Sequence, residues 1–233
     1  MHLLHSLTTL LASGAALALA VPAKLVARDS PFSDLDLPAD FWGNMDNYCR
    51  NGVPTKRRSR SVPGHPLDRR ASKPSGYQEV APGTYTKDFE AVTVNGAWTD
   101  FLVTCFGVVI IGDSTNAVSY SKFLAHFYAT PSLLDSLWTD VKNEVTAQGL
   151  TNLRGWISLP DRSTAPADLD QNDMLTVENT MRDLVTQLTG QAPTVRYHNM
   201  ADASARVGDV GTMQYNNADK TVLIDGTVVE FGT

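Results

Sequence analysis

The chain contains very little cysteine, no long apolar run beyond its N-terminal region and no asparagine-linked glycosylation signal. Only two of its 233 residues are cysteines, Cys49 and Cys105, so a small scaffold held together by many disulfides is excluded. The apolar run Leu10–Ala20 is shorter than the roughly 20 residues that a membrane-spanning helix needs. We therefore expect no membrane contact in the mature protein.

Patterns typical of cofactor and metal sites are also missing. The sequence has no P-loop, no dinucleotide-binding glycine pattern and no zinc-ligand spacing. The acidic residues between Asp161 and Asp173 lack the glycine and the closing glutamate of a calcium-binding loop. We expect neither a cofactor nor a metal.

The charge of the C-terminal part argues against a nucleic-acid partner. Residues 71–233 contain ten lysines and arginines against nineteen aspartates and glutamates, a net charge of −9. Phosphate contacts need clustered positive side chains, and this part of the sequence has no basic stripe. Its length suits one domain with a sizeable core.

The N-terminal part has the pattern of a secreted precursor. The apolar run ends in Ala18-Leu19-Ala20, which fits cleavage by signal peptidase. We interpret residues 1–20 as a signal peptide and the protein as secreted to the extracellular space.

Residues 21–70 are rich in Pro, Ser, Asp and Arg, which indicates a propeptide or a disordered linker. The basic clusters Lys56–Arg60 and Asp68–Arg70 predict cleavage by a kexin-like processing protease, with Arg58, Arg60 and Arg70 as the processing residues. Residues 71–233 would then form the mature domain.

This domain has the alternating strand and helix patterns of an α+β fold. Amphipathic periods of three and four predict a helix that begins at Pro131 and ends near Gly149, and a second from Leu175 to Leu188. Strands are predicted at Glu90–Val94, Phe101–Ile111, Ala117–Ala129, Leu153–Leu159 and Thr194–His198, followed by a strand meander over residues 211–231. We expect a mostly antiparallel sheet with the two helices packed on it.

Three interpretations of the cysteines remain open. Cys49 and Cys105 pair as a disulfide, the default in a secreted protein. Alternatively, Cys105 is a small buried apolar residue, or it is a nucleophile: a lone thiol once the propeptide has left, which the propeptide could mask until processing.

A nucleophilic cysteine needs a base within reach, usually histidine. The domain contains only His126 and His198. If Phe101–Ile111 and Ala117–Ala129 form a hairpin around a loop near Ser114, Cys105 lies opposite a residue between 123 and 126. Hairpin geometry therefore favours His126, whereas His198 would approach only through tertiary folding.

The order of Thr99, Cys105, an apolar strand, a hairpin, Leu124-Ala125-His126-Phe127 and Pro131 resembles the chemoreceptor glutamine deamidase family, CheD. The resemblance covers most of residues 76–233 and implies the fold shared with the deamidase domains of cytotoxic necrotizing factor toxins. It implies that Cys105 attacks the carboxamide of a protein glutamine, with His126 as base and Thr99 orienting the imidazole. The backbone N–H groups of Thr104 and Cys105 would stabilise the oxyanion.

Two functional hypotheses follow. The first is a secreted cysteine hydrolase, a toxin or effector that deamidates glutamine in a partner protein; an amine in place of water would make the same site a transglutaminase. The second is a secreted binding module without enzymatic activity, in which Cys105 is buried or bonded to Cys49.

Overall fold

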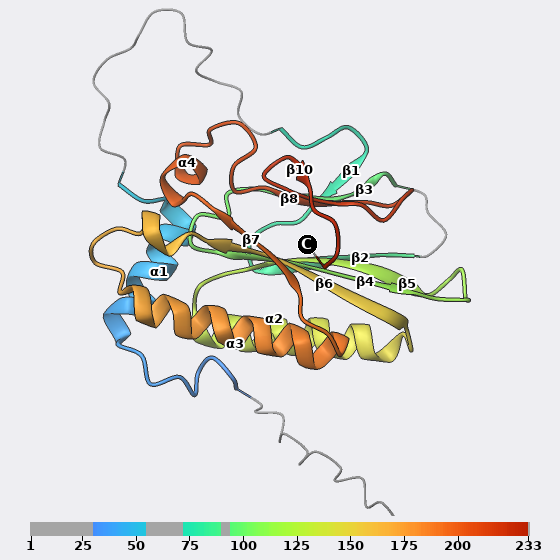
Figure 1. The fold of residues 1–233 in the computed structure, drawn as a ribbon, viewed down its shortest axis with the longest axis horizontal. Helices are drawn as coiled ribbons and strands as arrows, with labels where there is room; N and C mark the ends of the chain where they lie inside the picture. The colour runs from blue at the N-terminus through green and yellow to red at the C-terminus, as the bar shows by residue number, and fades with distance from the viewer. Residues whose placement is uncertain (1–29, 55–71, 90–93, 233) are drawn as a thin grey trace, which may run out of the picture.

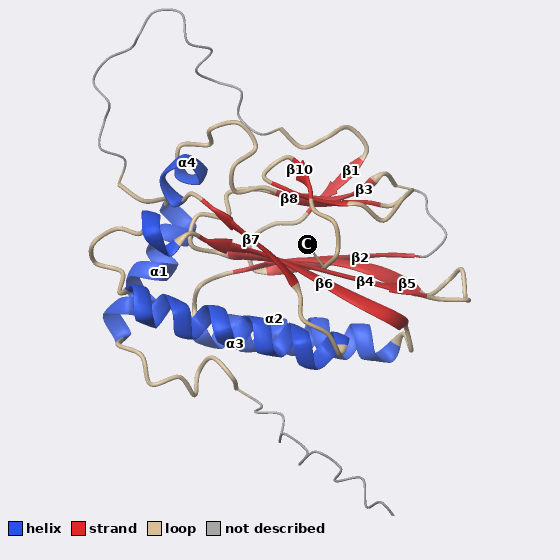
Figure 2. Cartoon of the chain, in the orientation of Figure 1, coloured by secondary structure: helices blue, strands red, loops and turns tan. Residues whose placement is uncertain are grey.

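The chain folds into three stacked layers, which the computed structural model describes for residues 30–54, 72–89 and 94–232. Two helices form one outer layer, a five-stranded sheet forms the middle layer and a second sheet of five short strands forms the other outer layer (Figures 1 and 2). The α+β class predicted from the sequence is confirmed.

The middle sheet has the strand order β2-β5-β4-β6-β7. Its pairs are antiparallel except β6 with β7, which is parallel. Nearly all residues of β4 and β5 are buried, as expected for strands that are covered on both faces. The strands are β2 (Thr84–Phe89), β4 (Phe106–Asp113), β5 (Tyr120–Phe127), β6 (Thr151–Pro160) and β7 (Thr194–His198).

The second sheet has the order β1-β3-β8-β9-β10. Its pairs are antiparallel except β1 with β3, which is parallel. The strands are β1 (Tyr77–Glu79), β3 (Gly96–Thr99), β8 (Met213–Asn216), β9 (Val222–Ile224) and β10 (Thr227–Val228). The predicted, mostly antiparallel pairing is confirmed, but the strands form two mixed sheets and not one. The predicted C-terminal meander forms, but it pairs with β3 and packs across the middle sheet.

Helices α2 (Pro131–Ala147) and α3 (Gln171–Thr189) pack on the middle sheet, α2 against β5 and α3 against β6. Pro131 stands at the start of α2, where its missing N–H costs nothing. Asp170 caps α3 by accepting hydrogen bonds from two backbone N–H groups, and Gly190 ends the helix in the left-handed conformation. Both predicted helices are confirmed. A short 3₁₀ helix, η1 (Arg162–Thr164), and the short helix α4 (Met200–Ser204) complete the C-terminal half.

Part of the segment expected to be a propeptide or disordered linker is folded. Residues 30–54 include helix α1 (Ala39–Asn51), which lies at one end of the layers (Figure 1). Its buried side chains recur on one face and join the main core: Phe41, Met45, Tyr48 and Cys49. The low hydrophobicity of the surrounding segment concealed this narrow apolar stripe.

The predicted signal peptide, residues 1–20, and the predicted processing residues Arg58, Arg60 and Arg70 lie outside the described residues, as does most of the predicted strand Glu90–Val94. Within the described part of the chain, no helix is both long and apolar enough to cross a membrane.

Candidate functional site: a buried disulfide beside a histidine

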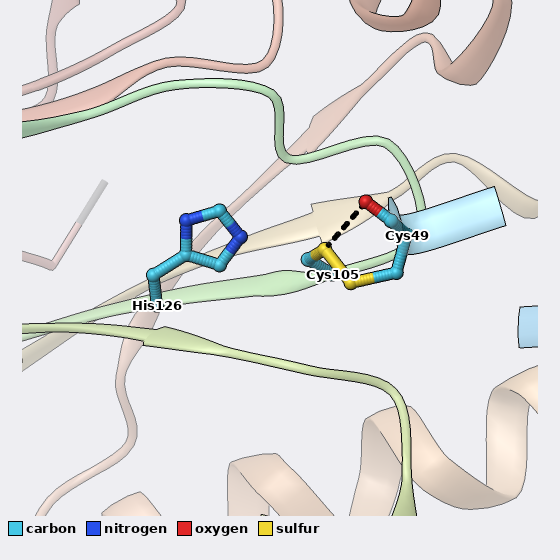
Figure 3. A group of neighbouring side chains, drawn as sticks. All are labelled: Cys49, Cys105 and His126. Atoms are coloured by element: carbon cyan, nitrogen blue, oxygen red, sulfur yellow. Dashed lines mark hydrogen bonds between the residues drawn. A yellow bond between two sulfur atoms is a disulfide. The ribbon is translucent and has the colours of Figure 1, made fainter. Parts of the chain in front are cut away.

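Cys49 and Cys105 form a disulfide that joins α1 to the loop preceding β4 (Figure 3). Cys105 is fully buried and Cys49 is 1% exposed. Of the three interpretations of the cysteines, the structure selects the disulfide. In this oxidised state Cys105 has no thiolate, so it cannot act as a nucleophile without prior reduction.

The β4–β5 hairpin brings His126 to the disulfide with a different register from the predicted one. Gly107, not Cys105, pairs with His126. The sequence prediction placed the loop too early in the chain: β4 continues to Asp113 and β5 begins only at Tyr120. The intervening loop is stabilised by local hydrogen bonds, including Val118 N–H to Asn116 Oδ1 at 3.1 Å.

Thr99 orients the His126 ring. Its Oγ1 donates a hydrogen bond to the Val80 carbonyl at 2.8 Å and lies 2.7 Å from Nδ1 of His126. A hydroxyl has one proton to donate. Because the Val80 carbonyl takes that proton, Thr99 accepts from Nδ1–H, and the lone pair of the neutral imidazole resides on Nε2.

That Nε2 lone pair faces the disulfide. Figure 3 shows a ring nitrogen directed toward Cys105, and since Nδ1 bonds Thr99, this nitrogen is Nε2. One ring nitrogen and the two sulfurs lie within 4.8 Å of one another. Nε2 is buried and makes no hydrogen bond with the described residues. A buried acceptor without a donor is unfavourable, and a thiol at Cys105 would supply that donor.

The surroundings keep His126 uncharged. Burial, together with the nearby His198, lowers the pKa of His126 from 6.5 to about 3. Its imidazole is therefore neutral at physiological pH. In this closed state the ring can accept a proton only at high cost, so chemistry at His126 requires the site to open.

Thr104 contacts α1 through its side chain, with Oγ1 donating to the Met45 carbonyl at 2.6 Å. The neighbouring backbone N–H groups of Leu102 and Val103 bond the carbonyls of Gly211 and Phe101. The backbone N–H groups of Thr104 and Cys105 remain the expected oxyanion donors.

A second buried histidine, His198, supports the cysteine loop, and sequence reasoning missed this role. Its Nε2 lies 3.1 Å from the Val103 carbonyl, and its Nδ1 lies 3.0 Å from Ser158 Oγ. A carbonyl only accepts, so Nε2 carries the proton and Ser158 donates to Nδ1. Burial lowers the pKa of His198 to about 4, so this histidine is also neutral. The parallel pairing of β6 with β7, not visible in the sequence, brings these residues together.

The cluster also contains potential metal ligands. In the described part of the chain, one group of buried side chains brings potential metal-ligand atoms close together: Cys49, Cys105 and His126. While the two sulfurs are bonded to each other, neither is a thiolate ligand. After reduction, two thiolates and an imidazole would be ligand types that zinc prefers.

Comparison of the chain with protein-family models, with curated proteins and with solved structures gives no match. The functional assignment therefore depends on the geometry of Thr99, His126 and the disulfide.

Proposed function

We propose that the protein is a latent cysteine hydrolase that deamidates glutamine side chains of a partner protein after reduction of the Cys49–Cys105 disulfide. It acts as a secreted effector or toxin, with residues 1–20 as its signal peptide. The proposal rests on one observation: the Nε2 lone pair of His126, set by Thr99, faces the Cys105 sulfur and has no donor among the described residues.

The residues supply the steps of carboxamide hydrolysis. In the reduced and opened site, His126 Nε2 takes the Cys105 proton, and the thiolate attacks the glutamine Cδ. The backbone N–H groups of Thr104 and Cys105 stabilise the oxyanion. The imidazolium protonates the departing nitrogen, so ammonia leaves and a thioester remains. Water, deprotonated by His126, then hydrolyses the thioester; glutamine and water become glutamate and ammonia, and Cys105 regains its proton.

Ammonia release from glutamine-containing proteins tests the proposal directly. We expect the unmodified chain to release ammonia only after reduction, and the rate to decrease at least 100-fold in Cys105→Ser and His126→Ala. A matched control is Cys49→Ser, which frees Cys105 without reductant and should be active. Release by reduced Cys105→Ser at the unmodified rate would remove Cys105 from the mechanism.

The second candidate is a secreted binding module without enzymatic activity. The disulfide and the full burial of Cys105 favour it, because a permanently oxidised sulfur has only a structural role. In that case Cys49→Ser would release no ammonia, and its Cys105 thiol would react with iodoacetamide no faster than an ordinary thiol at any pH.

A further inference from the structure

Residues 30–54, here called the strap, hold the cysteine loop closed through contacts that are independent of the disulfide. Met45 lies directly over this loop and accepts the Thr104 hydrogen bond. Val53 accepts a hydrogen bond from Ser204 Oγ at 3.2 Å. The apolar side chains that the strap buries are Phe32, Phe41, Met45, Tyr48 and Val53.

Polar anchors fix the strap at two points, its start to α2 and helix α1 to the loop that precedes α3. Asp135 of α2 accepts hydrogen bonds from the backbone N–H groups of Phe32 and Ser33, at 2.8 and 3.0 Å. Tyr48 donates to the Asp168 carboxylate at 2.6 Å. These hydrogen bonds hold the strap against the rest of the fold in addition to the disulfide.

The strap covers the side from which a substrate must approach. The Cys105 sulfur is bonded to Cys49, so it points at α1. Cys105 is fully buried, and a ring nitrogen of His126 lies within 4.8 Å of both sulfurs. Cys49 and α1 occupy the position directly at this sulfur, so a carboxamide that takes the place of the Cys49 side chain would meet Cys105.

We propose that the strap is an autoinhibitory segment that occupies the face for the substrate polypeptide, with the Cys49–Cys105 disulfide as its lock. This inference rests on the proposed function of Cys105. The covered face accepts one side of an amphipathic helix, with apolar residues spaced as Phe41, Met45 and Tyr48 are. The substrate that fits this face is therefore a helical segment with a glutamine at the position that Cys49 now occupies.

Release begins with a dithiol reductant. A thiolate of the reductant attacks one sulfur, the Cys49–Cys105 bond breaks, and the second thiol of the reductant resolves the mixed disulfide. Two electrons pass to the protein, each cysteine sulfur gains a proton, and the reductant leaves as its own disulfide. Because the expected cleavage residues Arg58, Arg60 and Arg70 lie between the two cysteines in sequence, cleavage alone leaves the strap attached.

The experiment uses the full chain with a site-specific protease sequence placed within residues 55–71. Four samples are compared in the presence of a metal chelator: intact or cleaved, each with or without dithiothreitol. Iodoacetamide labelling of Cys105 and hydrogen exchange in residues 39–51 are measured by mass spectrometry. Ammonia release from a glutamine protein is measured in parallel.

Without reductant, we expect no labelling and a protected α1 in both samples. Reduction should allow labelling and raise exchange in α1 at least tenfold. Cleavage with reduction should raise the labelling rate at least tenfold further, since the strap can then diffuse away. The proposal is overturned if reduced, cleaved protein keeps α1 protected, or if ammonia is released while the disulfide is intact.

The labelling and exchange readouts separate this proposal from the proposed function. If the strap leaves and Cys105 is labelled but no ammonia forms, the strap is confirmed as a releasable cover and the deamidase assignment fails. If ammonia forms after reduction at equal rates in intact and cleaved protein while α1 stays protected, the deamidase assignment holds and the strap proposal fails.

Discussion

The hydrogen bonds around His126 define the chemistry of the site at the scale of single residues. The Thr99 hydroxyl donates its single proton to the Val80 carbonyl, so it can only accept from His126. This selects the tautomer of His126 with the proton on Nδ1. His198 is held in the opposite tautomer by Val103 and Ser158. The two histidines thus have different tasks: one presents a lone pair to the sulfur, and the other holds the loop that carries the sulfur.

Thr99 is a positioning residue, and the pair Thr99→Val and Thr99→Ser tests this role. In Thr99→Val, the Nδ1–H and the Val80 carbonyl lose their partner, so we expect about 1–3 kcal/mol lower unfolding free energy. We also expect kcat of the reduced protein to fall about 10- to 100-fold, with little change in KM, because the general base is no longer oriented.

Thr99→Ser keeps the hydroxyl and should restore both quantities to near the unmodified level. Equal kcat values for the valine and serine variants would show that Thr99 has only a structural role.

The buried histidines predict that the oxidised protein loses stability on acidification. Their folded pKa values, about 3 for His126 and about 4 for His198, are below the usual 6.5. Between these values and 6.5 the unfolded chain binds more protons than the folded chain. Each unit by which the pH is lowered in this range therefore reduces the unfolding free energy by up to about 1.4 kcal/mol for each histidine. Asp225 acts in the opposite direction, since burial raises its pKa to about 6.

The measurement is denaturant unfolding of oxidised protein at several pH values between about 4.5 and 7. Replacing His126 by Asn should reduce the slope by about 1.4 kcal/mol per pH unit. An unchanged slope would show that His126 is not the titrating group.

At the scale of elements, α1 determines access to the sulfur. The disulfide is buried, so a reductant reaches it only when α1 moves away locally. Hydrogen bonding to Asp168 raises the pKa of Tyr48 to about 12, which keeps the phenol protonated as a donor at physiological pH.

We therefore expect Tyr48→Phe to accelerate reduction of Cys49–Cys105 by dithiothreitol. Loss of this partly exposed hydrogen bond should favour the open state by about 1 kcal/mol, or about fivefold in rate. The quantity measured is the disulfide fraction over time, determined by mass spectrometry after acid quench. Tyr77→Phe, on β1 in the other sheet, is the matched control and should reduce at the unmodified rate; equal rates for both variants would contradict gating by α1.

At the scale of the whole molecule, the disulfide joins the N-terminal segment to the centre of the fold. The two cysteines are 56 residues apart in sequence. Their bond lowers the conformational entropy of the unfolded chain and joins α1 to the loop before β4. It therefore stabilises the closed three-layer arrangement as one unit.

Replacing both cysteines by Ala should lower the unfolding free energy by about 4 kcal/mol relative to the oxidised protein, as expected for a loop of this length. Urea unfolding of oxidised, reduced and double-variant protein measures this effect. We expect the reduced protein to resemble the double variant. A double variant as stable as the oxidised protein would show that the bond adds little beyond the packing of α1.

The α+β class, both long helices and most strands followed from the sequence, because apolar periods and helix-end signals such as Pro131 and Gly149 act over a few residues. The proximity of His126 to Cys105 was also predictable, since a hairpin joins segments that are close in the chain. Its register was not, because the length of the loop after Asp113 depends on hydrogen bonds within that loop.

Only the tertiary structure decided the division into two sheets, the docking of α1, the support from His198 and the choice of disulfide over free thiol. Each of these depends on burial shared between segments far apart in sequence, and no local pattern records which distant partner completes a buried surface. The sequence alone therefore predicted the two long helices and most of the strands, and it proposed Thr99, Cys105 and His126 as candidate site residues. The packing of residues 30–54 over them decided that, in this state, the sulfur is bonded and covered.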